Sequence, residues 1–418
     1  MSDSKTEIFS SRRAFLRGAA ASGAGALAAV GATASTKPDK LITDIQPWAQ
    51  ELGDGVDVVP YGLPIEHEAD VIRRNVPWLT ADAISSVNFT PIHALDGTIT
   101  PQGCAFERHH SGAIDLKKQD YRLMINGLVD TPLVFTYADL ERFPRENHVY
   151  FCECAANTGM EWAGAQLNGA QFTHGMVHNM EYSGVALRTL LNEAGLGKAG
   201  VLKDKWVFVE GADASSNGRS IPMEKALDDV MIAFKANGEA LRKEHGYPVR
   251  LVVPGWEGNM WVKWIRRIEV MDQAVESREE TSKYTDTLED GFSRKWTWAM
   301  DAKSVITSPS PQVPVEHGRG PLVITGLAWS GRGSIKRVDV SKDGGKSWET
   351  ARLARPGEPK AVSRFYLDFL WDGNEMLLQS RAIDDTGYIQ PTKGMLRGVR
   401  GLNSIYHNNG IQTWHVAQ

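Results

Sequence analysis

The sequence predicts an α+β fold in which a domain of mixed helices and strands precedes an all-β domain. Up to Thr281, short runs of β-branched and aromatic residues alternate with short amphipathic segments. From Pro321 onward, short apolar strands follow one another with turn residues roughly every ten positions, as at Asp343-Gly344-Gly345. This spacing is typical of an immunoglobulin-like β-sandwich of about 100 residues. A chain of 418 residues has room for two or three domains.

Composition divides the chain into three predicted segments. Residues 1–34 contain Arg12-Arg13, an Ala/Gly-rich run and Ala32-Thr33-Ala34, which predict a twin-arginine export signal and hence a periplasmic protein. Residues 35–300 form the predicted catalytic domain, and residues 301–418 form the predicted sandwich. No run approaches 18 apolar residues, so we expect no membrane span. The net charge of −5 gives no reason to expect nucleic-acid binding.

Local patterns predict the individual elements of the first domain. The alternation from Tyr121 to Val129 indicates a strand, and Thr136 is a suitable cap for a short helix that follows it. Residues 183–194 have helical apolar spacing and are followed by Gly195, so they predict a helix. A second helix is predicted to open at Ile221-Pro222 and to run to about Ala233.

Two of the three cysteines stand at the end of a predicted buried strand. Residues 148–151 are mostly β-branched or aromatic, Cys152 and Cys154 follow, and residues 155–159 are small and polar. Reactive and ligand-binding groups commonly lie on such loops, where a rigid scaffold holds them. A disulfide within Cys-x-Cys is strained, so these two thiols are not expected to pair with each other. Pairing between Cys104 and Cys152 stays open.

Ionisable side chains gather at the predicted loop ends. They are Arg108, His110, Asp213, His245, Arg250 and Lys263. The surplus of cationic donors suggests an anionic ligand with a phosphate or a polar heterocycle, and a thiolate at Cys154 would prefer a soft or high-valent metal. A zinc site would need more Cys or His at short spacings. A cysteine nucleophile with His110 or His245 as its base would leave the other cations unexplained. The residues alone leave two alternatives open: a redox metal cofactor, or a structural cysteine among unrelated charges.

The order of the motifs resembles the sulfite oxidase family of molybdopterin enzymes over essentially the whole mature chain. Each motif is weak alone, but together and in this order they are specific. The residues that carry the resemblance are Phe106-Glu107-Arg108-His109-His110, Cys154-Ala155-Ala156-Asn157, His245-Gly246-Tyr247-Pro248-Val249-Arg250, Val262-Lys263-Trp264 and, in the sandwich, residues 340–348. The sandwich is similar to the dimerisation domain of that family.

The resemblance implies a molybdopterin cofactor whose molybdenum is bound by the Cys154 thiolate. It also implies that Tyr284 is an active-site tyrosine that donates a hydrogen bond beside the metal. The residues implied to contact the cofactor are Phe106, Arg108, His110, Asp213, His245, Arg250, Trp261, Val262 and Lys263. Cations suit the pterin phosphate, and a carboxylate suits the amino groups of the pterin. Cys152 has no implied role and is expected to be a buried core residue.

Two departures from the family pattern concern the substrate. Sulfite oxidases place a substrate-binding arginine two positions after the residue that corresponds to Asn157, where this chain has Gly159. A second substrate arginine near the C-terminus is replaced by Asn409 or a neighbour. The loss of two cations weakens the binding of a small dianion and widens the pocket. We therefore expect that an arginine restored at residue 159 would raise activity toward free sulfite.

Within the family, the leader and residues 281–286 are most similar to the exported sulfane dehydrogenase branch of the Sox thiosulfate-oxidising system. That branch implies molybdenum-dependent oxidation of sulfane sulfur held as a cysteine persulfide on a sulfur-carrier protein. A c-type cytochrome would accept the electrons, because the chain lacks a Cys-x-x-Cys-His haem motif. The resemblance also implies a homodimer, formed through the sandwich, within a heterotetramer.

Three alternative functions are weighed against this one. The first is a periplasmic sulfite dehydrogenase that acts on free sulfite, against which Gly159 counts. The second is a periplasmic reductase, against which the C-terminal sandwich counts. The third is a binding or assembly module without the metal, against which the intact Cys154 counts.

Overall fold

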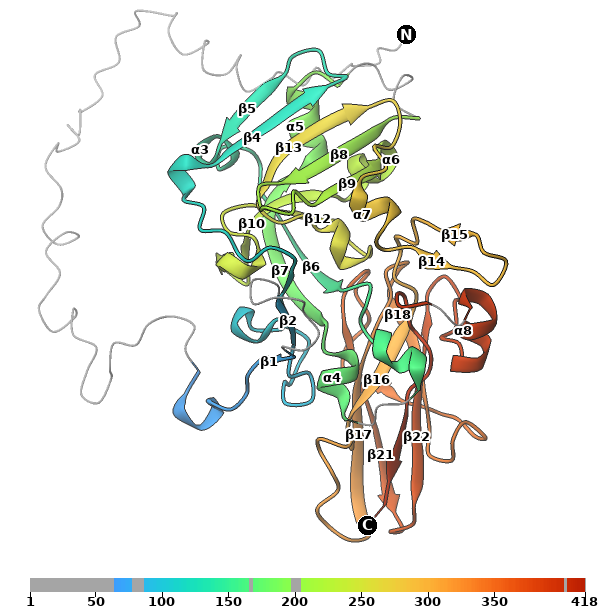
Figure 1. Ribbon diagram of the computed structural model, residues 1–418. Helices are drawn as coiled ribbons and strands as arrows, with labels where there is room; N and C mark the ends of the chain where they lie inside the picture. The colour runs from blue at the N-terminus through green and yellow to red at the C-terminus, as the bar shows by residue number, and fades with distance from the viewer. Residues whose placement is uncertain (1–63, 77–85, 165–167, 197–203, 402–403, 418) are drawn as a thin grey trace, which may run out of the picture. The chain divides into compact units, whose positions relative to one another are not determined.

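The computed structural model describes residues 64–76, 86–164, 168–196, 204–401 and 404–417. The predicted twin-arginine leader, and the predicted catalytic domain as far as residue 63, lie outside the described residues. All described residues belong to one compact unit that begins at Pro64. Figure 1 shows small sheets and short helices in the first part of this unit and long antiparallel strands in the last part.

The first domain contains two five-stranded sheets, and a three-stranded sheet precedes them in the sequence. One sheet has the strand order β11-β10-β7-β6, and β12 also pairs with β10. The other sheet has the order β5-β4-β13-β8-β9, in which β4 and β13 are parallel. Their strands are β4 Arg122–Gly127, β5 Leu133–Thr136, β6 Glu146–Glu153, β7 Val177–Ala186, β8 Trp206–Gly211, β9 Gly218–Pro222, β10 Met231–Ala236, β11 Glu239–Ala240, β12 Arg250–Val252 and β13 Ile265–Met271. The smaller sheet comprises β1 Arg74–Asn75, β2 Ser86–Phe89 and β3 Arg108–His109.

Short helices connect these strands. The α-helices are α3 Tyr137–Leu140, α4 Ala170–His174, α5 Leu187–Glu193, α6 Met223–Asp228, α7 Arg278–Thr281 and α8 Lys393–Arg400. The 3₁₀ turns are η3 Glu66–Glu68, η5 Gln102–Cys104, η6 Lys118–Asp120, η7 Gly159–Ala163, η9 Lys243–His245 and η10 Gly258–Met260. As predicted, Thr136 caps α3: its hydroxyl accepts from the Asp139 N–H and the Asp139 carboxylate accepts from the Thr136 N–H. None of the described helices is long and apolar enough to cross a membrane.

The C-terminal part is a sandwich of two four-stranded antiparallel sheets, ordered β16-β17-β21-β20 and β19-β18-β22-β23. The strands are β16 Lys303–Ser308, β17 Gly320–Trp329, β18 Ile335–Ser341, β19 Glu349–Thr350, β20 Arg352–Leu353, β21 Ser363–Trp371, β22 Met376–Asp384 and β23 Thr413–Val416. A short hairpin of β14 Asp286–Thr287 and β15 Ser293–Arg294 precedes it. The predicted α+β class followed by a sandwich is confirmed.

Two predicted helices are shorter than the sequence pattern suggested. Residues 183–186 belong to β7, where Val185 is opposite Ile232 of β10, and the helix α5 begins only at Leu187. Likewise α6 begins at Met223, after Pro222, and ends at Asp228. In both places apolar residues that match a helical period lie instead in a strand that is buried on both faces.

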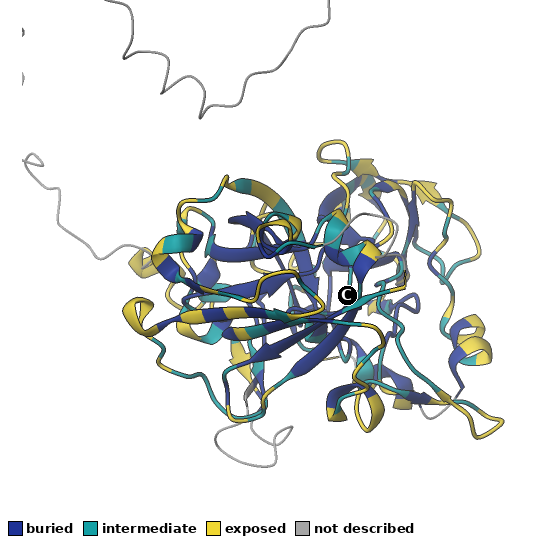
Figure 2. Cartoon of the chain, turned by 90° about the horizontal axis from the view of Figure 1, so that it is seen from above, coloured by how far each residue is buried: buried dark blue, intermediate teal, exposed yellow. Residues whose placement is uncertain are grey.

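The strand β6 contributes to both hydrophobic cores of the unit. Neighbouring residues of a strand point to opposite faces. Cys152 accordingly lies in the core of the first domain, whereas Phe151 lies in a second core with Trp329 and other sandwich residues. Figure 2 shows the buried strands of both parts in dark blue, with exposed residues on loops, on short helices and at some strand positions, as in β4.

A buried charge cluster centred on Glu153 joins the two cores. The Glu153 carboxylate accepts hydrogen bonds from Lys303 Nζ and Trp329 Nε1, each at 2.7 Å, and from Asn157 Nδ2 at 2.9 Å. The side chains of Glu153 and Lys303 are 0% and 1% exposed, so the ion pair is withdrawn from water. Lys303 and Trp329 belong to the sandwich, and Asn157 belongs to the loop after β6. The cluster therefore fastens the cysteine loop to the sandwich.

We expect Lys303→Met to lower the free energy of unfolding by about 3–5 kcal/mol, because it leaves the Glu153 charge buried and uncompensated. The double variant Glu153→Gln/Lys303→Met removes that charge and should recover much of the loss. Denaturant unfolding measures both. As a control, Arg142→Ala breaks an exposed pair with Asp139 and should cost less than about 1 kcal/mol. Equal losses in the single and double Lys303 variants would contradict this account.

Candidate active site

Cys154 is held rigidly where β6 ends. Its N–H donates to the Met176 carbonyl at 3.0 Å, and its own carbonyl accepts from the Asn157 N–H at 2.9 Å. The residue is only 8% exposed. Burial raises the pKa of the Cys154 thiol, and a hydrogen bond from the Ala156 N–H opposes this increase in part. All three cysteines are free, so Cys104 and Cys152 form no disulfide in the structure.

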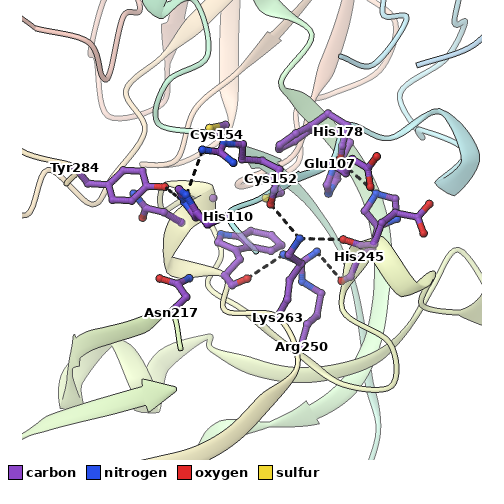
Figure 3. Close-up of a pocket in the computed structure, with 16 residues that line it drawn as sticks. Glu107, His110, Cys152, Cys154, His178, Asn217, His245, Arg250, Lys263 and Tyr284 are labelled. Atoms are coloured by element: carbon purple, nitrogen blue, oxygen red, sulfur yellow. Dashed lines mark hydrogen bonds between the residues drawn. The ribbon is translucent and has the colours of Figure 1, made fainter. Parts of the chain in front are cut away.

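A polar cavity on one side of Cys154 collects most of the residues that the sequence predicted (Figure 3). The predicted residues that line it are Phe106, Arg108, His110, Cys154, His245, Arg250, Trp261, Lys263 and Tyr284. Two predicted residues lie behind this lining. Val262 is buried in the core, and Asp213 is buried and accepts a hydrogen bond from the Ser215 hydroxyl. The negative charge of Asp213 still acts on the cavity, since it opposes in part the lowering of the pKa of His110 and of Lys263 that burial causes.

Lys263 and Arg250 place two cations at the base of the cavity. Lys263 Nζ donates to the carbonyls of Arg108 and Glu244, each at 3.0 Å. The Arg250 guanidinium donates to the carbonyls of His245 and Trp261, at 3.2 and 3.1 Å. These carbonyls fix the cations in position without neutralising them. Burial, reinforced by Arg250, lowers the pKa of Lys263 to about 7.

His110 and Tyr284 meet at the edge of the cavity nearest Cys154. His110 Nε2 lies 3.2 Å from the Tyr284 hydroxyl. Burial and then Arg108 lower the pKa of His110 to about 4, so its ring is neutral near pH 7. Burial raises the pKa of Tyr284, so its phenol keeps its proton. The Tyr284 backbone has a left-handed φ of 55°, and its ring lies 4.5 Å from the Arg219 guanidinium carbon, which restrains the hydroxyl.

A second cavity, of about 340 Å³, lies on the other side of Cys154. Cys154 and Arg108 line both cavities, so the thiol stands at their junction. The second cavity is also lined by Gly159, Met160 and Ile405. Its lining among the described residues is largely apolar. A thiol-bound metal would therefore face a polar chamber on one side and an apolar chamber on the other.

Gly159 is packed against the backbone of the C-terminal segment. A Cβ atom at residue 159 would lie 2.6 Å from the Ile405 carbonyl oxygen, which is closer than real side chains approach. An arginine at residue 159 therefore fits only if the segment at Ile405 moves. The gain in sulfite activity expected for Gly159→Arg depends on that movement. Asn409, the predicted replacement for the second arginine, borders a different small cavity and donates to the Ala302 carbonyl at 3.1 Å. Ile405 is the residue of this segment that lines the cavity beside Cys154.

Sequence reasoning missed several residues that shape the site. Glu153 escaped notice although a carboxylate between two cysteines of a buried strand is a detectable signal. His178 and Asn259 line the polar cavity, and Ile405 lines the apolar one. Nothing in the local sequence marks these three, because only the tertiary fold brings them to Cys154.

Comparisons with known proteins agree with this architecture. Residues 110–279 match the family model described as oxidoreductase molybdopterin binding domain, and residues 294–414 match the Mo-co oxidoreductase dimerisation domain. Sulfite oxidase of Gallus gallus is 31% identical over 74% of this chain and 72% of its own length. Mitochondrial sulfite oxidase of Mus musculus is 30% identical over 84% of this chain, which spans 66% of the mouse protein. The crystal structure of the sulfane dehydrogenase SoxCD from Paracoccus pantotrophus is 71% identical, with a TM-score of 0.84, and the match covers 91% of this chain and 97% of that one.

These matches first define the class: a molybdopterin-binding oxidoreductase domain followed by the dimerisation domain of the same class of enzymes. Within that class, the chain belongs to the sulfite oxidase family. The resemblance that the sequence motifs indicated is confirmed, and the cofactor of the family is the molybdenum cofactor.

The polar cavity fits this cofactor. His245 Nδ1 and both polar atoms of the Asn259 amide are buried without a hydrogen-bond partner among the described residues, as groups reserved for a polar ligand would be. The two cations at the base suit a phosphate. The described residues contain no cluster of three or more His, Cys, Asp or Glu side chains able to hold a metal ion. Molybdenum here would take one thiolate from the chain, at Cys154, and further ligands from the pterin.

We expect the affinity of the cofactor-free protein for molybdopterin to fall as pH rises through about 7, because Lys263 then loses its charge. The variant Lys263→Met should bind more weakly at pH 6 and show a flatter pH dependence. Titration followed by pterin fluorescence measures both. Lys295→Met, which removes a lysine paired with Glu276 outside the cavity, is the control. A pH dependence that persists unchanged in Lys263→Met would show that another group titrates.

Proposed function

We propose that the protein oxidises sulfane sulfur presented as a cysteine persulfide on a sulfur-carrier protein, in the periplasm, after export by the twin-arginine pathway. When bound, the molybdenum cofactor supplies two-electron oxygen transfer to sulfur. The observation that carries the proposal is the apolar cavity beside Cys154, in which the Ile405 carbonyl takes the space that a side chain at residue 159 would need. The 71% identity to a protein named sulfane dehydrogenase supports the same substrate class.

In this proposal Cys154 is the thiolate ligand of the metal. Its burial favours the neutral thiol, so a bound cation would keep it deprotonated. The Tyr284 hydroxyl, which keeps its proton and is held by His110, would donate a hydrogen bond to oxygen that develops on the sulfur. The restrained geometry of Tyr284 would limit the reorganisation needed at that step.

The remaining predicted residues would hold the cofactor in three ways. Charged and polar side chains of the lining would bind the phosphate and the heterocycle. These are Arg108, His110, His245, Arg250 and Lys263. Asp213 would act through its charge on the cations from behind the lining. Packing would fix the pterin ring against Phe106 and Trp261, with Val262 in the supporting core. This division follows from which side chains line the cavity and which lie behind it.

The electrons would leave to a c-type cytochrome subunit, since the chain contains no Cys-x-x-Cys-His motif of its own. The match of residues 294–414 to a dimerisation domain supports a homodimer through the sandwich. With one cytochrome on each protomer, the proposed assembly is a heterotetramer.

A second candidate function, oxidation of free sulfite, is favoured by one observation. Arg108 lines the cavity beside Cys154 and so places one cation near a bound anion. Relatives named sulfite oxidase share the fold. The absence of a side chain at residue 159 makes this the weaker candidate, because a single cation binds a dianion less strongly than several.

Cys154→Ser should abolish sulfur oxidation and reduce the molybdenum content, while the protein still folds, because a serine hydroxyl is far less acidic than a thiol and does not supply the soft thiolate donor. Activity is followed by reduction of cytochrome c, metal content by elemental analysis and folding by circular dichroism. Cys104→Ser removes a cysteine outside both cavities and is the control. Full activity and metal content in Cys154→Ser would refute the ligand assignment.

Ile405→Arg should lower the KM for free sulfite about tenfold, which corresponds to about 1.4 kcal/mol of added binding. It adds a cation to the cavity without placing a side chain at residue 159. Ile405→Gln is the matched neutral control and should leave that KM unchanged. Equal effects of the two variants would show that charge is not what limits sulfite binding. Efficient turnover of free sulfite by the wild type, without turnover of a persulfide, would replace the first candidate by the second.

A further inference from the structure

The cavity beside Cys154 opens onto an exposed apolar surface, which we call the mouth surface and define by Met160, Met395, Val399 and Ile405. Met160 and Ile405 line the cavity and are nevertheless 41% and 59% exposed, so they lie at its rim. Met395 and Val399 lie one helical turn apart on α8 and are 66% and 64% exposed. Exposed apolar groups gathered at one place are typical of binding surfaces.

Three polar contacts fix α8 beside the cavity. Lys393 Nζ forms an ion pair at 3.0 Å with Glu161, which lines the cavity, and Arg397 donates to the Trp162 carbonyl at 2.8 Å. At the other end of the helix, buried Arg400 pairs with Asp286 at 3.4 Å. Figure 1 shows α8 next to the β14–β15 hairpin, in agreement with these contacts. The outward face of α8 is thus a fixed continuation of the rim.

Packing against the described residues does not require the two glycines of α8. Among those residues, a Cβ at Gly394 would meet only the Thr392 hydroxyl, at 4.0 Å, and a Cβ at Gly398 would meet no atom within 4 Å. Neither glycine has a left-handed φ. Each lowers the stability of the helix relative to alanine. Gly159, by contrast, is packed tightly against Ile405. Bare helix backbone next to Met395 and Val399 is suited to close approach by another molecule.

The charge of α8 indicates what that molecule carries. The helix contains no acidic residue. Of its three cations, Lys393 pairs with Glu161 and the buried Arg400 pairs with Asp286. Arg397, whose guanidinium donates to a neutral carbonyl, is therefore the cation of α8 that a partner would meet. Met395 and Val399 lie outside the cavity lining, so a small anion inside the cavity gains nothing from them. Only a ligand that extends from the cavity over the helix contacts both.

We propose that the mouth surface docks the protein that delivers the substrate sulfur, through an apolar face of that partner that carries an acidic side chain opposite Arg397. The partner packs against Met395, Val399 and the two helix glycines, and it inserts a sulfur-bearing segment past Met160 and Ile405 toward Cys154. The inference rests on the proposed function and adds the location and the chemistry of the docking site.

The test compares two sulfur substrates with the molybdenum-loaded protein and ferricyanide as electron acceptor. One is the persulfide form of the sulfur-carrier protein, and the other is glutathione persulfide, which has no docking face. Met395→Glu and Val399→Glu should each lower kcat/KM for the carrier tenfold or more and leave that for glutathione persulfide unchanged. Val134→Glu alters a 55% exposed valine on β5, and it should affect neither.

The glycines give an independent readout. Gly394→Gln/Gly398→Gln should raise the melting temperature, because glutamine is a better helix former, yet lower kcat/KM for the carrier. A purely structural role of the helix would move stability and turnover in the same direction. Gly394→Ala/Gly398→Ala should give the same gain in stability with a smaller loss of carrier turnover.

The outcomes separate this inference from the proposed function. Unchanged carrier kinetics in the glutamate and glutamine variants refute the docking site alone. A loss confined to reduction of cytochrome c, with glutathione persulfide as substrate, also refutes it, because the surface then belongs to the electron acceptor. Oxidation of neither persulfide by the wild-type protein refutes the proposed function, and the docking inference is lost with it.

Discussion

The buried ion pair between Glu153 and Lys303 is the constraint on which the rest of the site depends. Glu153 is the residue immediately before Cys154, so whatever fixes its carboxylate also fixes the thiol. A carboxylate at 0% exposure is tolerated only with full compensation, which Lys303, Trp329 and Asn157 provide. Two of these partners belong to the sandwich. The position of the cysteine loop is thus determined jointly by both domains.

The C-terminal segment completes the loop from the opposite side. The His407 N–H donates to the Ala155 carbonyl at 2.8 Å, and the Asn408 amide donates to the Thr158 carbonyl at 3.1 Å. The same segment brings the Ile405 carbonyl against Gly159. This segment lies within the residues that match the dimerisation domain. In this chain, that domain therefore also shapes the chamber beside Cys154. Substitutions in this segment are therefore expected to change the shape of the chamber without contact to the polar cavity.

Sequence patterns captured the parts of this structure that local chemistry determines. The buried strand before Cys154, the capped helix after Thr136 and the motifs that line the polar cavity all follow from residues close together in the chain. Helix limits were misjudged at residues 183–186, where pairing between β7 and β10 overrode helical spacing. The sandwich partners of Glu153 and the role of Ile405 were missed because each depends on residues more than 140 positions away.

The buried positive charge of the polar cavity bears on whether the cofactor binds before or after the proposed export. Burial and mutual repulsion with Arg250 lower the pKa of Lys263, so the cavity without its ligand holds charge at a cost to folding. An anionic phosphate would offset the repulsion and favour the charged lysine, and a ligand that binds only the folded state stabilises it. The folded protein is thus most stable with the cofactor in place. The proposed twin-arginine export, a pathway for folded proteins, is compatible with that dependence, because the cofactor would then be inserted before translocation.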